Sequence, residues 1–121
     1  MTKLVAYEKR RAVGVITIDN PPVNALGWAV REALAACLAQ GADDGAVAAL
    51  VLVGAGRCFS AGADIREFDQ PAKPGVPGLR DVIEGFENCP KPVVAAIHET
   101  AVGGGLELAL GCHYRIGAPS A

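Results

Sequence analysis

The chain is 121 residues long and carries a formal net charge of −2, with 51% hydrophobic and 20% charged residues. These values predict one small packed domain and argue against a disordered tail. The acidic balance and the absence of a long basic cluster argue against a nucleic-acid or anionic-membrane partner, and no apolar run is long enough for a membrane helix. The irregularly spaced cysteines and isolated histidines predict free thiols and no metal site. The charged N-terminus predicts no export signal, and therefore a cytoplasmic protein.

The first part of the chain predicts a hairpin followed by a helix. Residues 4–19 have the β-branched alternation of two strands, joined by a tight turn at 10–11, and the prolines that follow end the second strand. The apolar spacing then changes to the helical period from residue 25 to residue 40. We expect Asn24 to be the N-cap of this helix and Gly41 to terminate it.

The remaining sequence alternates between buried-strand and helix patterns. Continuous apolar runs ending in glycine or histidine are typical of buried parallel strands, and an apolar stripe marks each helix. The expected strands are residues 46–56, 93–98 and 114–118, the expected helices are a short one after residue 64, then 79–86 and 104–111, and residues 69–78 form a surface connection. This order predicts an α/β fold of βαβ units around a mostly parallel sheet. The last strand lacks a covering helix, so we expect the chain to end within a fold.

Two glycine-rich segments, 54–64 and 98–105, each follow an expected buried strand and lead into a helix. Ligands bind at such carboxyl ends of parallel strands. A helix N-terminus has unpaired amides, and glycines let a ligand atom approach them, so one amide from each segment forms a candidate oxyanion hole. A dinucleotide site is disfavoured because Phe59 stands where its last glycine is needed, and a phosphate loop is disfavoured because Gly-Lys-Ser or Gly-Lys-Thr is absent.

Glu107 lies one helical turn beyond Gly104, so both fall on one face of the last predicted helix. A carboxylate beside an oxyanion hole is suited to move a proton near a polarised carbonyl. An acidic residue in a first turn also serves as a partner of the helix dipole. Asp64 likewise has a simple alternative role as the cap of the short helix after it. The residues alone leave these alternatives open.

The motifs resemble a known family along nearly the whole chain. The segments GAGRCFSAGADIREF and CPKPVVAAIHETAVGGGLELALGCHYRIGA resemble the crotonase superfamily, the enoyl-CoA hydratases and isomerases. NPPVNAL, AGADIREF and LGCHYRI are most similar to the N-terminal hydratase part of multifunctional fatty-acid oxidation enzymes, in which a 3-hydroxyacyl-CoA dehydrogenase part follows. The resemblance implies a crotonase-like (ClpP/crotonase) ββα spiral, with residues 1–121 as a partial domain from its N-terminal part.

The resemblance also implies roles for individual residues. The amides of Ala63 and Gly104 would hold the thioester oxygen of an acyl-CoA and stabilise its enolate, and Glu107 would be the general base that activates water. The substrate-binding residues implied by the same match are Ala61, Ala63, Asp64, Ile65, Arg66 and Gly104. The expected partner is an acyl-CoA or enoyl-CoA, and no cofactor is expected because coenzyme A is part of the substrate.

Two departures from the family pattern affect these expectations. Glu99 stands where members usually have glycine, and the second catalytic glutamate of the family would fall beyond Ala121. We therefore expect an enoyl-CoA hydratase (a lyase) of fatty-acid β-oxidation whose 121 residues alone are inactive. The alternatives are a non-catalytic acyl-CoA-binding or assembly fragment and an enoyl-CoA isomerase. We also expect a homo-oligomer, or docking onto missing C-terminal segments.

Overall fold

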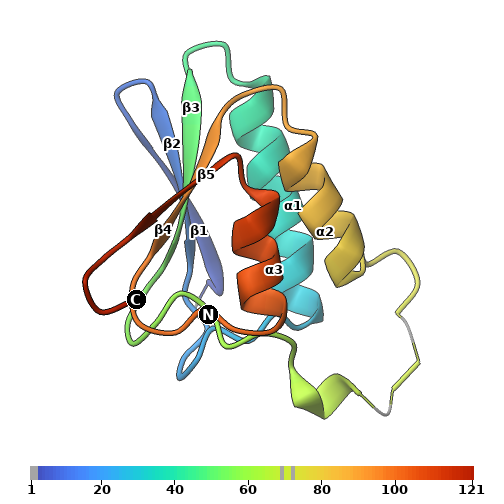
Figure 1. Cartoon of the computed structure of the whole chain (residues 1–121). Helices are drawn as coiled ribbons and strands as arrows, with labels where there is room; N and C mark the ends of the chain where they lie inside the picture. The colour runs from blue at the N-terminus through green and yellow to red at the C-terminus, as the bar shows by residue number, and fades with distance from the viewer. Residues whose placement is uncertain (1–2, 69, 72) are drawn as a thin grey trace.

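The structure is a computed structural model that describes residues 3–68, 70–71 and 73–121. Figure 1 shows a sheet with the helices packed against one of its faces. In chain order the elements are β1 (Val5–Arg10), β2 (Val13–Ile18), α1 (Trp28–Asp43), β3 (Ala49–Gly54), the 3-10 helix η1 (Ile65–Glu67), α2 (Leu79–Glu87), β4 (Val93–Ile97), α3 (Gly104–Gly111) and β5 (Tyr114–Gly117). Residues 69 and 72 of the predicted surface connection lie outside the described residues. The α/β fold predicted from the sequence is confirmed.

The strands of the described sheet follow the order β1-β2-β3-β4-β5, so each strand pairs with its neighbour in the sequence. β1 and β2 form the predicted antiparallel hairpin, which turns at Arg11 and Ala12. β2, β3, β4 and β5 are parallel to one another. The carboxyl ends of β3 and β4 therefore lie side by side at one end of the sheet, which is where parallel sheets bind ligands.

The first predicted helix is displaced along the chain. α1 runs from Trp28 to Asp43 and has Gly27 as its N-cap. The prediction of Asn24 as N-cap is wrong, because Asn24 is left-handed at φ 53° and its buried side chain bonds to a later loop. The prediction of Gly41 as terminator is also wrong. Gly41 lies within the helix, where an added Cβ would collide with the side chain of Leu50, so this glycine serves packing.

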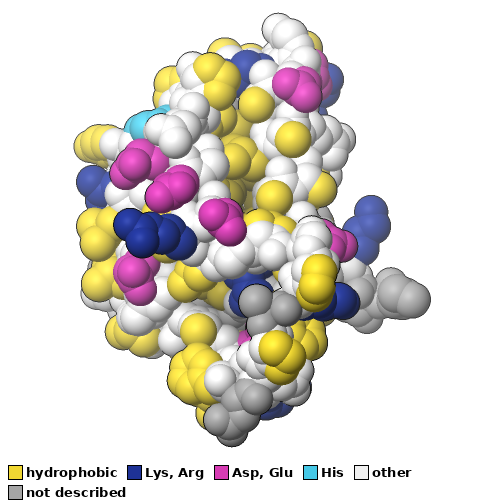
Figure 2. Space-filling view, turned by 90° about the vertical axis from the view of Figure 1, so that its right-hand side faces the viewer, with side chains coloured by type: hydrophobic (Ala, Val, Ile, Leu, Met, Phe, Trp, Pro, Cys, Tyr) yellow, Lys and Arg dark blue, Asp and Glu magenta, His cyan; other side chains and the backbone are white. Residues whose placement is uncertain are grey.

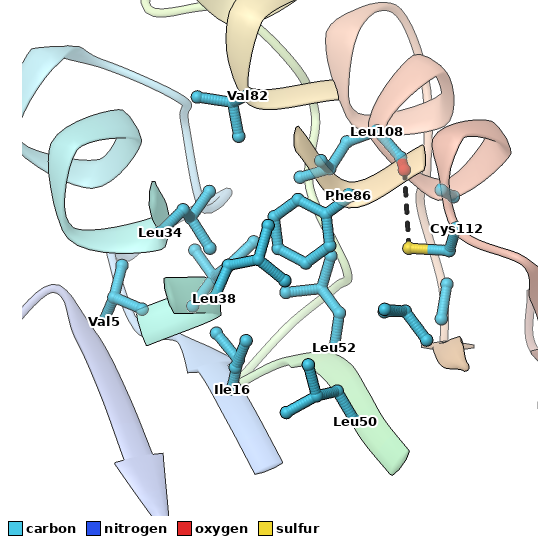
Figure 3. Packing of buried hydrophobic residues seen from close by; sticks show 14 of the residues in the cluster. Val5, Ile16, Leu34, Leu38, Leu50, Leu52, Val82, Phe86, Leu108 and Cys112 are labelled. Carbon is cyan, nitrogen blue, oxygen red and sulfur yellow. Dashed lines mark hydrogen bonds between the residues drawn. The ribbon is translucent and has the colours of Figure 1, made fainter. Parts of the chain in front are cut away.

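The hydrophobic core lies between the helices and the sheet. Alternate residues of β2 and β3 are buried and their neighbours are half-buried, which confirms the predicted buried strand, although β3 is shorter than the predicted range 46–56. Figure 3 shows Phe86 of α2 among Leu34 of α1, Leu52 of β3 and Leu108 of α3. The cysteines are free, as predicted, and burial raises the pKa of Cys112 to about 12.

The opposite face of the sheet is less covered. Its side chains on β2 and β3 are half-buried, and all residues of β5 are exposed. Tyr114 and Ile116 of β5 are 60% and 57% exposed. None of the helices in the described residues combines the length and the apolar character that a membrane crossing requires.

Candidate active site

The two glycine-rich loops run side by side beyond the ends of β3 and β4. Ser60 and Ala101 form an isolated parallel bridge between them. The Ser60 amide donates to the Thr100 carbonyl at 3.2 Å, and the Val102 amide donates to the Ser60 carbonyl at 3.3 Å. The parallel pairing of the two strands therefore continues into the loops, and it brings segments 54–64 and 98–105 together as the sequence predicted.

Buried polar side chains hold the first loop. Asn24 is 2% exposed, and its Nδ2 lies within hydrogen-bond distance of three carbonyl oxygens, those of Ala55, Cys58 and Phe59, at 3.0, 2.8 and 3.2 Å. Ser60 is fully buried, and its hydroxyl donates to the Asn24 carbonyl at 2.8 Å. These bonds satisfy buried carbonyls that would otherwise destabilise the loop.

The second loop approaches the first because it lacks side chains. An added Cβ on Gly105 would collide with the backbone carbonyl of Ser60, and Gly103 adopts φ 53°, which favours glycine. α3 begins at Gly104 in the predicted place. Without the glycines, α3 could not start against the backbone of the first loop.

This approach places the Ala63 and Gly104 amides next to each other. A Cβ built on Gly104 would lie 3.5 Å from the Ala63 nitrogen, and a Cβ built on Gly62 would lie 3.0 Å from the Gly104 nitrogen. Among the described residues, neither the Ala63 nor the Gly104 amide donates a hydrogen bond. Two neighbouring free amides, one at a helix N-terminus, are arranged to bind an oxygen that gains negative charge.

Glu107 lies in the first turn of α3 and is exposed. It borders a hollow of about 460 Å³ together with Leu79 and Ile83 of α2 and three charged residues of that helix, Arg80, Glu84 and Glu87. Figure 2, which looks onto the helix side, shows acidic side chains gathered around a basic one. Leu79 also borders a hollow of about 320 Å³ that contains Ala63. The structure thus brings Glu107 and Ala63 to neighbouring hollows with Leu79 between them.

Asp64 and Arg66 form a pair beside the Ala63 amide. Asp64 caps η1 by accepting from the Arg66 amide at 3.0 Å, and it accepts from Arg66 Nη2 at 2.6 Å. The hydrogen bonds from Arg66 hold the pKa of the Asp64 carboxyl below its usual value, against the opposing effect of burial. The capping role considered for Asp64 is confirmed. Ile65 is 76% exposed, so its side chain is free for contact with a ligand.

Ala61 borders a different hollow from Ala63. This hollow of about 370 Å³ also contains Arg57 and Glu99. Glu99 is left-handed at φ 52°, and its amide donates to the Ser120 hydroxyl at 3.3 Å. Glu99 stands where the family pattern has glycine, and it keeps the left-handed conformation that glycine favours. It also adds a carboxylate to a hollow beside the predicted binding stretch.

Both histidines bind backbone groups. His98 Nε2 lies 2.9 Å from the Gly56 carbonyl oxygen, and His113 Nδ1 accepts from the Val93 amide at 2.9 Å. Within the described residues there is no group of three or more His, Cys, Asp or Glu side chains placed to hold a metal ion.

Two residues that hold the first loop of the candidate site, Asn24 and Ser60, are not predicted in that role from the sequence. The sequence predicts a helix cap at Asn24 because asparagine commonly caps helices. A buried polar residue gives no local pattern that reveals a distant partner. The available signal is Asn24 itself, two residues after Pro22, since asparagine also tolerates the left-handed conformation found there.

Comparison with known proteins gives consistent results. A family model described as enoyl-CoA hydratase/isomerase matches residues 8–121. The chain is 46% identical over 114 residues to a probable enoyl-CoA hydratase of Bacillus subtilis, covering 90% of this chain and 44% of that protein. It is 51% identical over 108 residues to the peroxisomal bifunctional enzyme of Danio rerio, covering 88% of this chain and 15% of that protein. The chain therefore spans less than half the length of these relatives.

Solved structures agree with the sequence matches. An enoyl-CoA hydratase/carnithine racemase from Magnetospirillum magneticum superposes with a TM-score of 0.88 at 31% identity, covering 99% of this chain and 48% of that chain. A probable enoyl-CoA hydratase/isomerase from Mycobacterium abscessus gives a TM-score of 0.83 at 35% identity, covering 97% and 46%. Since the Danio rerio relative is named as peroxisomal, the cytoplasmic location stays a prediction.

Proposed function

Because the chain belongs to the enoyl-CoA hydratase/isomerase family, we propose that it carries the acyl-CoA site of an enoyl-CoA hydratase of fatty-acid β-oxidation. The crotonase resemblance and the crotonase-like fold predicted from the sequence are confirmed by the same matches. Relatives named as fatty acid β-oxidation multifunctional proteins support the choice of pathway. In this proposal the Ala63 and Gly104 amides bind the thioester oxygen and Glu107 is the general base.

One observation carries the proposal. The Ala63 and Gly104 amides are adjacent, and neither donates a hydrogen bond within the described residues. A thioester carbonyl placed between them would accept two hydrogen bonds. These bonds strengthen as the oxygen gains negative charge, so they stabilise the enolate more than the ground state.

The chemistry follows from that enolate. Glu107 takes a proton from water while the water oxygen forms a bond to C3 of the enoyl chain, and the C2–C3 π electrons move toward the carbonyl. The negative charge then rests on the thioester oxygen, between the two amides. Protonation at C2 completes the addition of water across the double bond. That last step needs an acid, which is either protonated Glu107 or a second group.

The residues around Ala63 suit a long anionic thioester. Ala61, Asp64, Ile65 and Arg66 lie on the same loop and η1, and the Arg66 side chain is 80% exposed. We propose that this stretch binds the coenzyme A part of the substrate. The pairing with Asp64 orients the guanidinium and leaves it accessible to an anionic group.

A second candidate is isomerisation of an enoyl-CoA by the same site. Moving a double bond requires removal of a proton from one carbon and its return to another, which a single carboxylate can perform. Glu107 is the carboxylate of the proposed site, because Asp64 and Glu67 are both paired with arginines. Hydration and isomerisation therefore differ in how the enolate forms, by addition of water at C3 or by removal of a proton from C2, and they share the oxyanion site.

The third candidate is an assembly fragment that does no chemistry. Its support is a set of exposed apolar residues at helical spacing, Val102 just before α3 and Leu106 and Leu110 on α3, which are 50%, 43% and 57% exposed. Exposed apolar surface favours association. Light scattering during size-exclusion chromatography measures this directly, and a monomer at every concentration would contradict the predicted association.

The decisive experiment is hydrogen exchange at C2 of butyryl-CoA in D₂O, because it needs only a base and an oxyanion hole. We expect Glu107→Gln to slow the exchange by about 10²–10⁴-fold, since the amide keeps the size but cannot accept the proton. Glu84→Gln is the matched control, as Glu84 borders the same hollow but sits in an exposed pair with Arg80. Equal, measurable exchange in wild type and Glu107→Gln would show that Glu107 does not move the C2 proton, which would overturn isomerisation by this carboxylate and assign the last step of hydration to a second group.

Turnover is a separate question from proton exchange. We propose that the 121 residues alone do not hydrate crotonyl-CoA at a useful rate, because Glu107 supplies one carboxylate where water addition uses a base and an acid. Loss of the enoyl absorbance measures the reaction. A rate near that of a complete hydratase would show that no second carboxylate is needed.

A further inference from the structure

Glu67, at the end of η1, is bonded to the start of α1 through both carboxylate oxygens. Oε2 accepts from the Trp28 amide at 2.9 Å, and Oε1 accepts from Arg31 Nη1 at 3.3 Å. The Arg31 and Glu67 side chains are only 14% and 18% exposed. An acidic group is favourable at a helix N-terminus, where the free amides and the helix dipole are positive. Glu67 therefore fixes η1 against α1.

Arg31 extends this connection to two further backbone segments. Its Nη1 donates to the Leu26 carbonyl at 2.7 Å, and its Nε donates to the Pro77 carbonyl at 2.9 Å. The Leu26 amide in turn donates to the Gly62 carbonyl at 2.9 Å. Pro77 precedes Gly78, the N-cap of α2. One guanidinium thus joins η1, the segment before α1 and the segment before α2.

These segments surround the proposed oxyanion site. Gly62 comes directly before Ala63, and η1 follows it, so the backbone is held on both sides of the Ala63 amide. α2 begins at Leu79, whose Cδ2 would lie 2.6 Å from a Cβ added to Gly104. The hydrogen bonds of Arg31 and Glu67 therefore fix η1 and the segments before α1 and α2, which border both amides.

We propose that Arg31 and Glu67 are positioning residues that hold the Ala63 amide in register with the Gly104 amide. The inference rests on the proposed function, since it assumes that these amides bind the carbonyl oxygen. A largely buried ion pair contributes little net stability, because desolvation offsets the attraction, but its bonds fix a geometry. A displacement of about 1 Å at a reacting centre can lower a rate about 10²-fold. Neither side chain needs to touch the substrate for this effect.

The test compares two ligands that differ in one oxygen atom. Butyryl-CoA is a thioester, and S-butyl-CoA is the thioether without the carbonyl oxygen. The Kd of each is measured by NMR titration of the 121-residue chain as wild type, Glu67→Gln, Arg31→Lys and Lys9→Met. Lys9→Met is the control, because it breaks an ion pair with Asp44, just beyond the far end of α1. The ratio of thioether Kd to thioester Kd isolates the contacts to the oxygen.

We expect a wild-type ratio of about tenfold, from two amide hydrogen bonds, and a ratio of about twofold in Glu67→Gln. Affinity for the thioether should be unchanged in that variant, and Lys9→Met should keep the wild-type ratio. Arg31→Lys keeps the charge but loses the forked donor geometry, so it should also lower the ratio. If Glu67→Gln does not fold, Arg31→Lys is the variant compared with the wild type.

Two outcomes overturn different claims. A wild-type ratio that persists in both variants while their melting temperatures fall would show that the pair only stabilises the fold, and this would overturn the positioning role. A ratio near one in the wild type would show that the carbonyl oxygen is not bound, and this would overturn the proposed function together with the inference.

Discussion

The two loops of the candidate site are held in opposite ways. The loop after β3 is fixed by added groups, the buried side chains of Asn24 and Ser60. The loop after β4 is held by close packing of its backbone, since Gly103, Gly104 and Gly105 have no Cβ atoms and let this backbone approach Ser60 and Ala63. A free amide can therefore be positioned by satisfying the carbonyls around it or by removing the Cβ atoms in its way. The first arrangement should fail when a donor is lost, and the second when an atom is added.

The largest expected effect is the loss of the donor in the first loop. Asn24→Ala leaves the part-buried carbonyl of Ala55 and the buried carbonyls of Cys58 and Phe59 without their partner. We expect the free energy of unfolding to fall by about 3–5 kcal/mol, as each unsatisfied buried group costs about 1–3 kcal/mol. Urea denaturation measures it. Asn20→Ala, which removes a side-chain bond to one carbonyl, should lose about 1 kcal/mol, and equal losses would contradict the special role of Asn24.

The complementary change adds an atom to the second loop. Gly105→Ala places a Cβ 2.8 Å from the Ser60 carbonyl carbon, and both groups belong to backbones that cannot move freely. We expect a loss of about 1–3 kcal/mol, which is typical of overpacking. Gly45→Ala is the matched control, because nothing lies within 4 Å of its added Cβ. If the two variants unfold at the same urea concentration, close packing does not hold this loop.

Gly104→Ala should separate binding from stability. Its Cβ would meet Leu79 Cδ2, the end of a flexible side chain, and would lie 3.5 Å from the Ala63 nitrogen. We expect a stability loss below about 1 kcal/mol. Butyryl-CoA binding should weaken about fivefold, as if one hydrogen bond were lost, while free coenzyme A binding stays unchanged. Calorimetric titration checks this, and equal weakening of both ligands would place the carbonyl elsewhere.

Glu99 allows the reverse change, in which atoms are removed from the second loop. Glu99→Gly relieves a left-handed residue at φ 52°, and we expect a gain of about 0.5–1 kcal/mol after the larger chain entropy of glycine is subtracted. Arg11→Gly, at φ 55° in the hairpin turn, should raise the free energy of unfolding by a similar amount. Thermal unfolding of both variants compares them. A loss confined to Glu99→Gly would mean that its side chain supports the loop.

The smallest expected effect is on the pH dependence of the free energy of unfolding, through Asp64 at the end of the first loop. The pKa of Asp64 is lowered in the folded state by hydrogen bonds from Arg66. Its stabilising contribution is therefore present above the unfolded pKa of about 3.9 and is lost as the pH falls through the lower folded value. Asp64→Asn should make the free energy of unfolding less dependent on pH, and only in that acid range. An unchanged acid slope in urea titrations would show that Asp64 does not stabilise η1.

The sequence alone determined the elements whose signals are local. The hairpin, the start of α3 at Gly104 and the cap at Asp64 all depend on residues within one or two turns of each other. The glycine pattern also predicts both loops of the candidate site, because glycines before a helix indicate accessible amides whatever segment packs against them.

Tertiary structure alone decided which polar side chains and which glycines serve distant segments. Asn24 reaches carbonyls 31 to 35 residues later, and Arg31 meets Glu67 across 36 residues. Gly41 is needed by Leu50 rather than by a helix end. Such partners depend on which surfaces pack together, and patterns spanning a few residues hold no information on that choice. The physical reason is that a buried polar atom must find a hydrogen-bond partner, and burial is a property of the assembled fold.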